Sequence, residues 1–123
     1  TVKPLVGPSA ILLALMASGM NGQQFRFLGY LPIDSPQRAK TIKDLETESF
    51  KKNFTQIFIE TPYRNNQLLE ALIQHCKAST RLCIAVDITG KNEMIRTMKM
   101  AEWKTKMPNL HKQPVIFCLN ANA

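Results

Sequence analysis

The stretch that most limits how this chain can fold runs from Ile57 to Leu69, with the sequence IFIETPYRNNQLL. Its apolar start is typical of a buried strand, and Glu60 follows at the strand's carboxyl end. Thr61 predicts a helix cap, Pro62 suits the first helical turn, and Arg64 comes one turn in. Parallel α/β sheets bind ligands at such corners, so the stretch predicts an α/β fold with a candidate site. A plainer interpretation is a capped helix whose Glu60 and Arg64 only pair with each other.

Strand and helix patterns alternate along the rest of the chain, with no repeat and no internal linker. The predicted strands cover Phe25–Leu31, Thr55–Glu60, Arg81–Ile88, Met94–Met100 and Pro114–Leu119. The predicted helices cover Ser9–Ser18, Ser35 to the break at Asn53, Pro62–Cys76 and Ala101–Met107. This order predicts a single layered α/β domain with a mixed sheet of about five strands flanked by helices.

Two of these helices have a clear apolar stripe, and one is apolar nearly all round. The expected buried side of the second helix consists of Ala39, Ile42, Leu45 and Phe50, and that of the third consists of Leu68, Leu69, Leu72 and Ile73. The first helix, over Ser9–Ser18, must be covered on most sides. Its cover is either the rest of this domain or a partner that the chain lacks.

The charge of the chain is compatible with a polyanionic partner. Its 123 residues include 16 Lys and Arg against 9 Asp and Glu, for a formal net charge of +7. An excess of this kind suits RNA. However, the basic residues are scattered, with no block longer than Lys51–Lys52, so a merely basic surface explains the charge equally well.

The three cysteines, Cys76, Cys83 and Cys118, are widely spaced and odd in number, which does not suit a disulfide framework or a zinc site. They are expected to be small apolar residues in a reducing cytoplasm, and no metal centre is expected. The longest apolar segment, Ala10–Ala17, is too short to cross a bilayer. No signal peptide is visible. Because the chain starts at Thr1 without a methionine, we expect it to be part of a longer protein.

Four motifs in collinear order resemble one known family. They are PLVGPSAILLALMASG at Pro4–Gly19, FLGYLP at Phe27–Pro32, IFIETPYR at Ile57–Arg64 and DITGKNE at Asp87–Glu93. Together they resemble the C-terminal half of a tetrapyrrole-methylase-type S-adenosylmethionine (SAM) methyltransferase, nearest to the ribosomal RNA small subunit methyltransferase I branch. The resemblance implies two α/β domains with SAM between them. Residues 1–123 are then the C-terminal domain, and the N-terminal domain with its glycine-rich loop is absent from this chain.

The resemblance also implies a set of site residues. Those expected to contact SAM are Gly7, Pro8, Ser9, Ala10, Ile59, Glu60, Thr61, Asp87, Thr89 and Met98. Tyr63 and Arg64 are expected to contact the substrate, and the guanidinium fork of Arg64 suits an RNA phosphate or the carboxylate of SAM. Purely structural roles stay open as alternatives: Gly7–Ala10 form an ordinary helix start, and Asp87 and Thr89 stabilise a turn.

The chain departs from the family pattern at several of these positions. Thr61 and Tyr63 stand where the family usually has a serine and a histidine, and Asp87 replaces a glutamate. Met98 replaces a glycine, and Gln113–Pro114 replaces a glycine–glutamate pair. Thr61 still suits a helix cap and Asp87 keeps its charge, whereas a side chain at position 98 would narrow a cofactor cleft.

Three functions are compatible with these residues. The first is methylation of a ribose 2′-hydroxyl in small-subunit ribosomal RNA by a homodimer; the second is methylation of a tetrapyrrole or another small molecule. The third is a non-enzymatic RNA- or protein-binding domain, although the sequence shows no aromatic cluster for stacking single strands. Trp103, His75 and His111 are assigned to packing or to the surface. No catalytic base is identified, so we expect the base in the missing half or in a partner subunit, and the isolated chain to be inactive.

Overall fold

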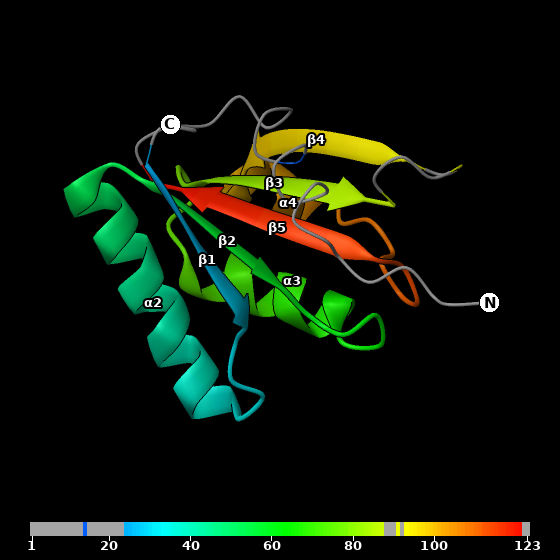
Figure 1. Ribbon diagram of the computed structural model, residues 1–123, viewed down its shortest axis with the longest axis horizontal. Coiled ribbons are helices and arrows are strands. Elements are labelled where there is room, and N and C mark those ends of the chain that lie inside the picture. Colours follow the sequence, from blue (N-terminus) through cyan, green and yellow to red (C-terminus); the bar gives the residue numbers. More distant parts are fainter. Residues whose placement is uncertain (1–13, 15–23, 88–90, 92, 122–123) are drawn as a thin grey trace.

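The computed structural model describes residues 14, 24–87, 91 and 93–121. They form a sheet with helices packed on one face (Figure 1). In chain order the elements are β1 (Phe25–Tyr30), α2 (Ser35–Lys52), β2 (Thr55–Ile59), α3 (Asn65–His75), β3 (Arg81–Val86), β4 (Met94–Lys99), α4 (Met100–Thr105) and β5 (Val115–Asn120). The predicted helix over Ser9–Ser18, the loop at Gly7–Ala10, and Thr89 lie outside the described residues, apart from Ala14.

All five predicted strands are present, and they form one mixed sheet in the order β1-β2-β5-β3-β4. β1 and β2 are parallel, whereas β5 runs antiparallel to β2 and β3, and β4 runs antiparallel to β3. This arrangement confirms the prediction of an α/β domain with a mixed five-stranded sheet flanked by helices.

Strand register brings three carboxyl ends to one edge of the sheet. Ile59, at the end of β2, pairs with Ile116, and Val86, at the end of β3, pairs with Val115 and Met94. Since β1 is parallel to β2, it also ends at this edge. We call this end of the sheet the rim. β1, β2 and β3 end there, and β4 and β5 begin there. The arrowheads of β1, β2 and β3 point towards it in Figure 1.

The sheet carries an apolar core on each face. On the helical face, Phe58 and Phe117 of neighbouring strands stack with ring centroids 5.7 Å apart and planes 11° apart. Helices α2, α3 and α4 cover this face with buried aliphatic and aromatic side chains. The opposite face buries a set of smaller residues: Ala14, Ile57, Cys83, Ala85, Ile116 and Cys118. The three cysteines carry free thiols, and two of them are buried, which confirms the prediction of small apolar residues at those two positions.

Helix α2 buries a different set of side chains from the one that the sequence predicts. Ile42 and Leu45 are buried as expected, and Ser49 continues the stripe one turn later. The prediction for Phe50 is wrong, because its side chain is 61% exposed. One residue beyond Ser49, it is rotated by about 100° from the buried side. Its ring centroid lies 5.9 Å from the Lys77 ammonium, within cation–π distance.

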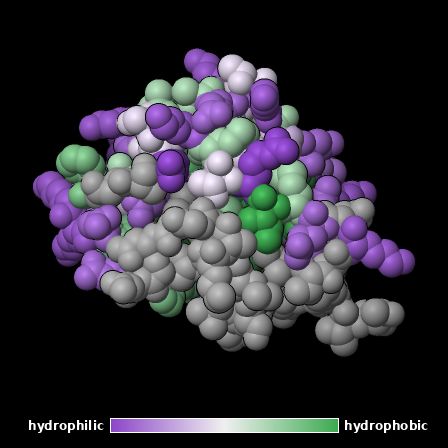
Figure 2. Space-filling model, turned by 90° about the horizontal axis from the view of Figure 1, so that it is seen from above, coloured by the Kyte–Doolittle hydropathy of each residue, from purple (hydrophilic) through white to green (hydrophobic). Residues whose placement is uncertain are grey.

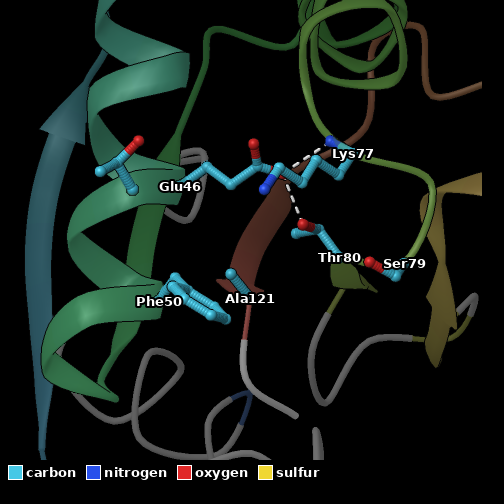
Figure 3. Close-up of a pocket in the computed structure, with 7 residues that line it drawn as sticks. Glu46, Phe50, Lys77, Ser79, Thr80 and Ala121 are labelled. Carbon is cyan, nitrogen blue, oxygen red and sulfur yellow. Dashed lines mark hydrogen bonds between the residues drawn. The ribbon is translucent and has the colours of Figure 1, made fainter.

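Glu46 is a buried carboxylate that pattern analysis of α2 misses. Its Oε2 accepts hydrogen bonds from the Lys77 backbone N–H at 2.7 Å and from the Thr80 hydroxyl at 2.5 Å (Figure 3). Burial, and then the Glu46 carboxylate, raise the pKa of the Cys76 thiol well above its ordinary value. These bonds join α2 to the segment before β3. The pocket that they border, also lined by Ala121, lies at the sheet edge opposite the rim.

Gly29 interrupts β1 with a register shift relative to β2. Its φ of 73° lies in the left-handed region, and an added Cβ would meet nothing within 4 Å. The Gly29→Ala substitution is therefore expected to lower the free energy of unfolding by about 1 kcal/mol through backbone strain alone. Urea denaturation measures this loss. Gly29→Asn should lose less, because asparagine tolerates this conformation, and an equal loss in both variants would contradict the assignment to backbone strain.

Candidate functional site

The rim gathers the predicted site residues that follow β2 and β3. Glu60 comes directly after Ile59, and Asp87 comes directly after the last residue of β3. The start of β5 lies between them, and the Asp87 N–H donates to the Pro114 carbonyl at 2.9 Å. Asp87 adopts a φ of 49°, a conformation that Asp accepts more readily than most residues. Register alone therefore places Ile59, Glu60 and Asp87 on one edge.

The corner after β2 is a turn rather than a helix start. Helix α3 begins at Asn65, and the Arg64 N–H donates to the Thr61 carbonyl at 2.9 Å to close the turn. The prediction that Thr61 caps a helix with Pro62 in its first turn is therefore wrong. The Glu60 carboxylate accepts the N–H of the neighbouring Thr61 at 2.8 Å.

Asn65 secures this turn from the other side. Its Nδ2 donates to the carbonyls of Leu110 at 3.1 Å and Gln113 at 2.6 Å, both in the segment before β5. The Lys112 N–H donates in turn to the Pro62 carbonyl at 2.9 Å. Local sequence favours a helix start here, but these contacts with a distant loop hold Thr61–Arg64 in a turn at the rim.

Glu60 is the most buried charged group of the corner, with its side chain only 2% exposed. Its Oε1 lies 3.8 Å from Arg64 Nε, so the ion pair that the sequence allows is present. The pair is long, however, and Arg64 Nε makes no hydrogen bond. Glu60 Oε2 is also buried without a hydrogen-bond partner. Leaving a buried polar group unsatisfied costs about 1–3 kcal/mol, and more for a charged one.

Asn65 adds a third unsatisfied atom to the same corner, because its Oδ1 is buried without a hydrogen-bond partner. A carboxylate oxygen, an amide oxygen and a guanidinium nitrogen therefore all have unused hydrogen-bonding capacity here. Arg64 extends outward from this group, with its side chain 34% exposed. Such a mixed set of acceptors and one cation suits a ligand that carries hydroxyl groups and a charged tail.

An exposed aromatic pair lies beside this corner. The rings of Tyr63 and His111 meet edge to face, with centroids 5.7 Å apart and planes at 72°. Tyr63 is 67% exposed, and His111 is also exposed. Sequence analysis assigned His111 to packing or surface and found no aromatic grouping, because the two residues are far apart in the chain. The only local signal was the turn chemistry of the segment Pro108–Pro114.

Met98 is not brought to the rim. It pairs with Leu82 in the half of β4 that lies away from Met94, and it packs against the helical-face core. Its predicted contact with a cofactor thus gains no support from position. The predicted contacts at Gly7, Pro8, Ser9, Ala10 and Thr89 stay predictions, because those residues lie outside the described part of the chain.

Figure 2 shows hydrophilic side chains at several places around one face, with hydrophobic ones between them. Among the described residues, none of the groups of three or more His, Cys, Asp or Glu is arranged to hold a metal ion. No helix within the same residues has the length and apolar character needed to cross a membrane.

Comparison with known proteins gives relatives in sequence and in structure, although no protein-family model matches. A protein of Vibrio cholerae serotype O1 named ribosomal RNA small subunit methyltransferase I is 32% identical over 122 residues, which cover 97% of this chain and 41% of that protein. Relatives of the same name in other bacteria share 28–37% identity with the chain. The chain thus spans less than half the length of the relatives that it matches.

Two solved structures share the fold. The methyltransferase CobJ superposes with a TM-score of 0.58 at 16% identity, covering 90% of this chain and 47% of that one. The cobalamin biosynthesis precorrin-6Y methylase of Archaeoglobus fulgidus superposes with a TM-score of 0.51 at 10% identity, covering 93% and 46%. At these identities the likeness concerns the fold alone. The chain is thus similar over nearly its whole length to proteins named ribosomal RNA small subunit methyltransferase I, and it spans less than half of the length of such a protein.

Proposed function

We propose that this chain is the C-terminal half of a SAM-dependent methyltransferase and that its rim forms one wall of the cofactor cleft. The observation that carries the proposal is the corner at Glu60, where buried polar atoms are left without partners at the edge to which three strands lead. Ligands of α/β proteins bind at such strand ends. The opposite wall belongs to the N-terminal domain that the family resemblance implies.

The residues of the corner fit SAM. SAM would supply a methyl group on a sulfonium: an acceptor oxygen would bond to the methyl carbon while the carbon–sulfur bond breaks, and S-adenosylhomocysteine would leave. Glu60 Oε2 is an acceptor suited to a ribose hydroxyl, and backbone groups at Ile59 suit the edge of an adenine. Arg64 is suited either to the carboxylate of the amino-acid tail or to a phosphate of the substrate. In this proposal the rim binds and orients SAM, and the base that takes the acceptor proton belongs to the missing half or to a partner subunit.

The substrate that we propose is small-subunit ribosomal RNA, methylated on a ribose 2′-hydroxyl. Support comes from the relatives' name and from the formal net charge of +7. A tetrapyrrole substrate is the second candidate, because a precorrin methylase shares the fold, but its identity to this chain is only 10%. A homodimer in the cytoplasm is a further expectation of the resemblance.

The test uses a chimeric protein in which this chain replaces the matching 122-residue stretch of the Vibrio cholerae relative. Expressed in a strain that lacks its own enzyme, the chimera is expected to restore one 2′-O-methylated nucleotide in small-subunit ribosomal RNA, read by mass spectrometry. The unmodified relative is the positive control. A chimera that folds and binds SAM but leaves the RNA unmethylated would contradict the proposed substrate, and one that folds without binding SAM would contradict the proposed cleft.

A further inference from the structure

The exposed pair at the rim, Tyr63 and His111, has the geometry of an open stacking surface. In an edge-to-face contact one ring covers only one face of the other, so ring faces remain free for a third planar group. Both side chains are exposed, and Tyr63 is two thirds exposed. Exposed aromatic rings of this kind stack on unpaired nucleobases.

The pair is held in place by hydrogen bonds between two loops. The Lys112 N–H bonds to the Pro62 carbonyl at 2.9 Å, directly beside both rings. Asn66 adds two bonds: its Oδ1 accepts from the Leu110 N–H at 2.7 Å, and its Nδ2 donates to Asn109 Oδ1 at 3.0 Å. A surface organised in advance loses little conformational entropy when it binds.

The charge of the two loops selects the kind of partner. The segment from Thr61 to Asn66 contains Arg64 and no acidic residue. The segment from Lys106 to Pro114 contains two lysines and a histidine, again without an acidic residue. Cations around free ring faces suit a single-stranded nucleic acid, whose phosphates and bases need both features.

We propose that Tyr63 and His111 stack on an unpaired base of the RNA substrate, close to the nucleotide that is methylated, while Arg64 and Lys112 hold neighbouring phosphates. The inference rests on the proposed function for the identity of the RNA, and it adds the way in which that RNA is recognised. It also assigns a role to His111, which the sequence alone does not indicate.

Fluorescence anisotropy of the 123-residue chain with a labelled single-stranded RNA 12-mer tests the platform without SAM or methyl transfer. Tyr63→Ala and His111→Ala are each expected to weaken RNA binding about tenfold, whereas Tyr63→Phe keeps most of the affinity. Phe50→Ala is the matched control, because Phe50 is an aromatic residue that is 61% exposed and lies near the end of α2, beside the pocket opposite the rim. Arg64→Ala and Lys112→Ala should reduce the salt dependence of binding.

The inference is overturned if the chain does not bind the 12-mer, if a double-stranded RNA binds equally well, or if Phe50→Ala weakens binding as much as Tyr63→Ala. Its failure is distinct from failure of the proposed function. If the chimera methylates ribosomal RNA but Tyr63→Ala leaves the RNA affinity of the chain unchanged, only the stacking of Tyr63 and His111 on RNA is contradicted. If Tyr63→Ala weakens RNA binding as expected but the chimera does not methylate ribosomal RNA, only the proposed reaction is contradicted.

Discussion

The Glu60→Gln variant of the chimera is expected to bind SAM about 10- to 100-fold more weakly than the chimera itself, which is the value of a hydrogen bond to a charged group. The carboxylate accepts the Thr61 N–H through Oε1, whereas Oε2 has no hydrogen-bond partner and is the atom that we propose accepts a ligand hydroxyl. A glutamine of the same shape has only one acceptor oxygen, so it cannot serve both donors. Isothermal titration calorimetry with S-adenosylhomocysteine measures the difference.

Glu48→Gln is the matched control for this variant. Glu48 is also paired with an arginine, with 2.9 Å between its Oε1 and Arg26 Nη1, but it lies on α2 away from the rim. We expect this control to leave the affinity for S-adenosylhomocysteine unchanged. Equal losses in both variants, or an unchanged affinity in Glu60→Gln, would remove Glu60 from the cofactor site.

The Arg64→Ala variant distinguishes two roles for the Glu60 carboxylate, namely ligand binding and pairing with Arg64 alone. If Glu60 exists only to pair with Arg64, Arg64→Ala should lower the free energy of unfolding as much as Glu60→Gln does. The 3.8 Å separation and the one-third exposure of the Arg64 side chain predict a small stability effect, below about 1 kcal/mol. The expected pattern is therefore a small change in stability together with weaker ligand binding.

The Trp103→Ala variant is expected to lose about 3–5 kcal/mol of unfolding free energy, the usual cost of deleting a buried tryptophan. The Trp103 side chain is 1% exposed, and its Nε1–H donates to the Leu82 carbonyl at 2.8 Å. It joins the short helix α4 to β3 on the helical face. A loss of this size is a large share of the about 5–15 kcal/mol that stabilises a typical domain.

Urea denaturation of the isolated chain measures this loss, with Trp103→Phe as the control. The phenylalanine variant keeps most of the packing and loses the hydrogen bond, so we expect it to be less destabilised than Trp103→Ala. If Trp103→Ala costs less than about 1 kcal/mol, the core of the helical face is not assembled around this side chain.

The central strands β3 and β5 could be predicted from sequence because each is a short, mostly apolar run between turn residues. The run Pro114–Leu119 and the core of Arg81–Ile88 matched β5 and β3 within about two residues at each end. The start of α3 could not be predicted, because Pro62 and Asn65 are held by hydrogen bonds to the distant loop before β5. The exposure of Phe50 was missed because helical spacing alone did not show that Glu46 and Ser49 face inward.

The positions of candidate site residues could be predicted from sequence where they depend only on which strand each residue ends or follows. Ile59, Glu60 and Asp87 follow strands that end at the same edge, so a correct sheet brings them together. Met98 was assigned by resemblance, and the register of β4 places it beside Leu82 instead. The contact between Tyr63 and His111 depends on a loop folding back over the β2–α3 corner, and local sequence patterns contain no information about such a contact.

Hydrogen–deuterium exchange of the chimera with and without S-adenosylhomocysteine tests the central claim most directly. Peptides that cover the rim, residues 59–65, 84–87 and 113–116, are expected to exchange more slowly when the ligand is present. Peptides at the opposite edge, residues 78–82 and 97–100, are expected to be unchanged. Protection at the opposite edge, with the rim unchanged, would contradict the assignment of the rim as the wall of the cofactor cleft.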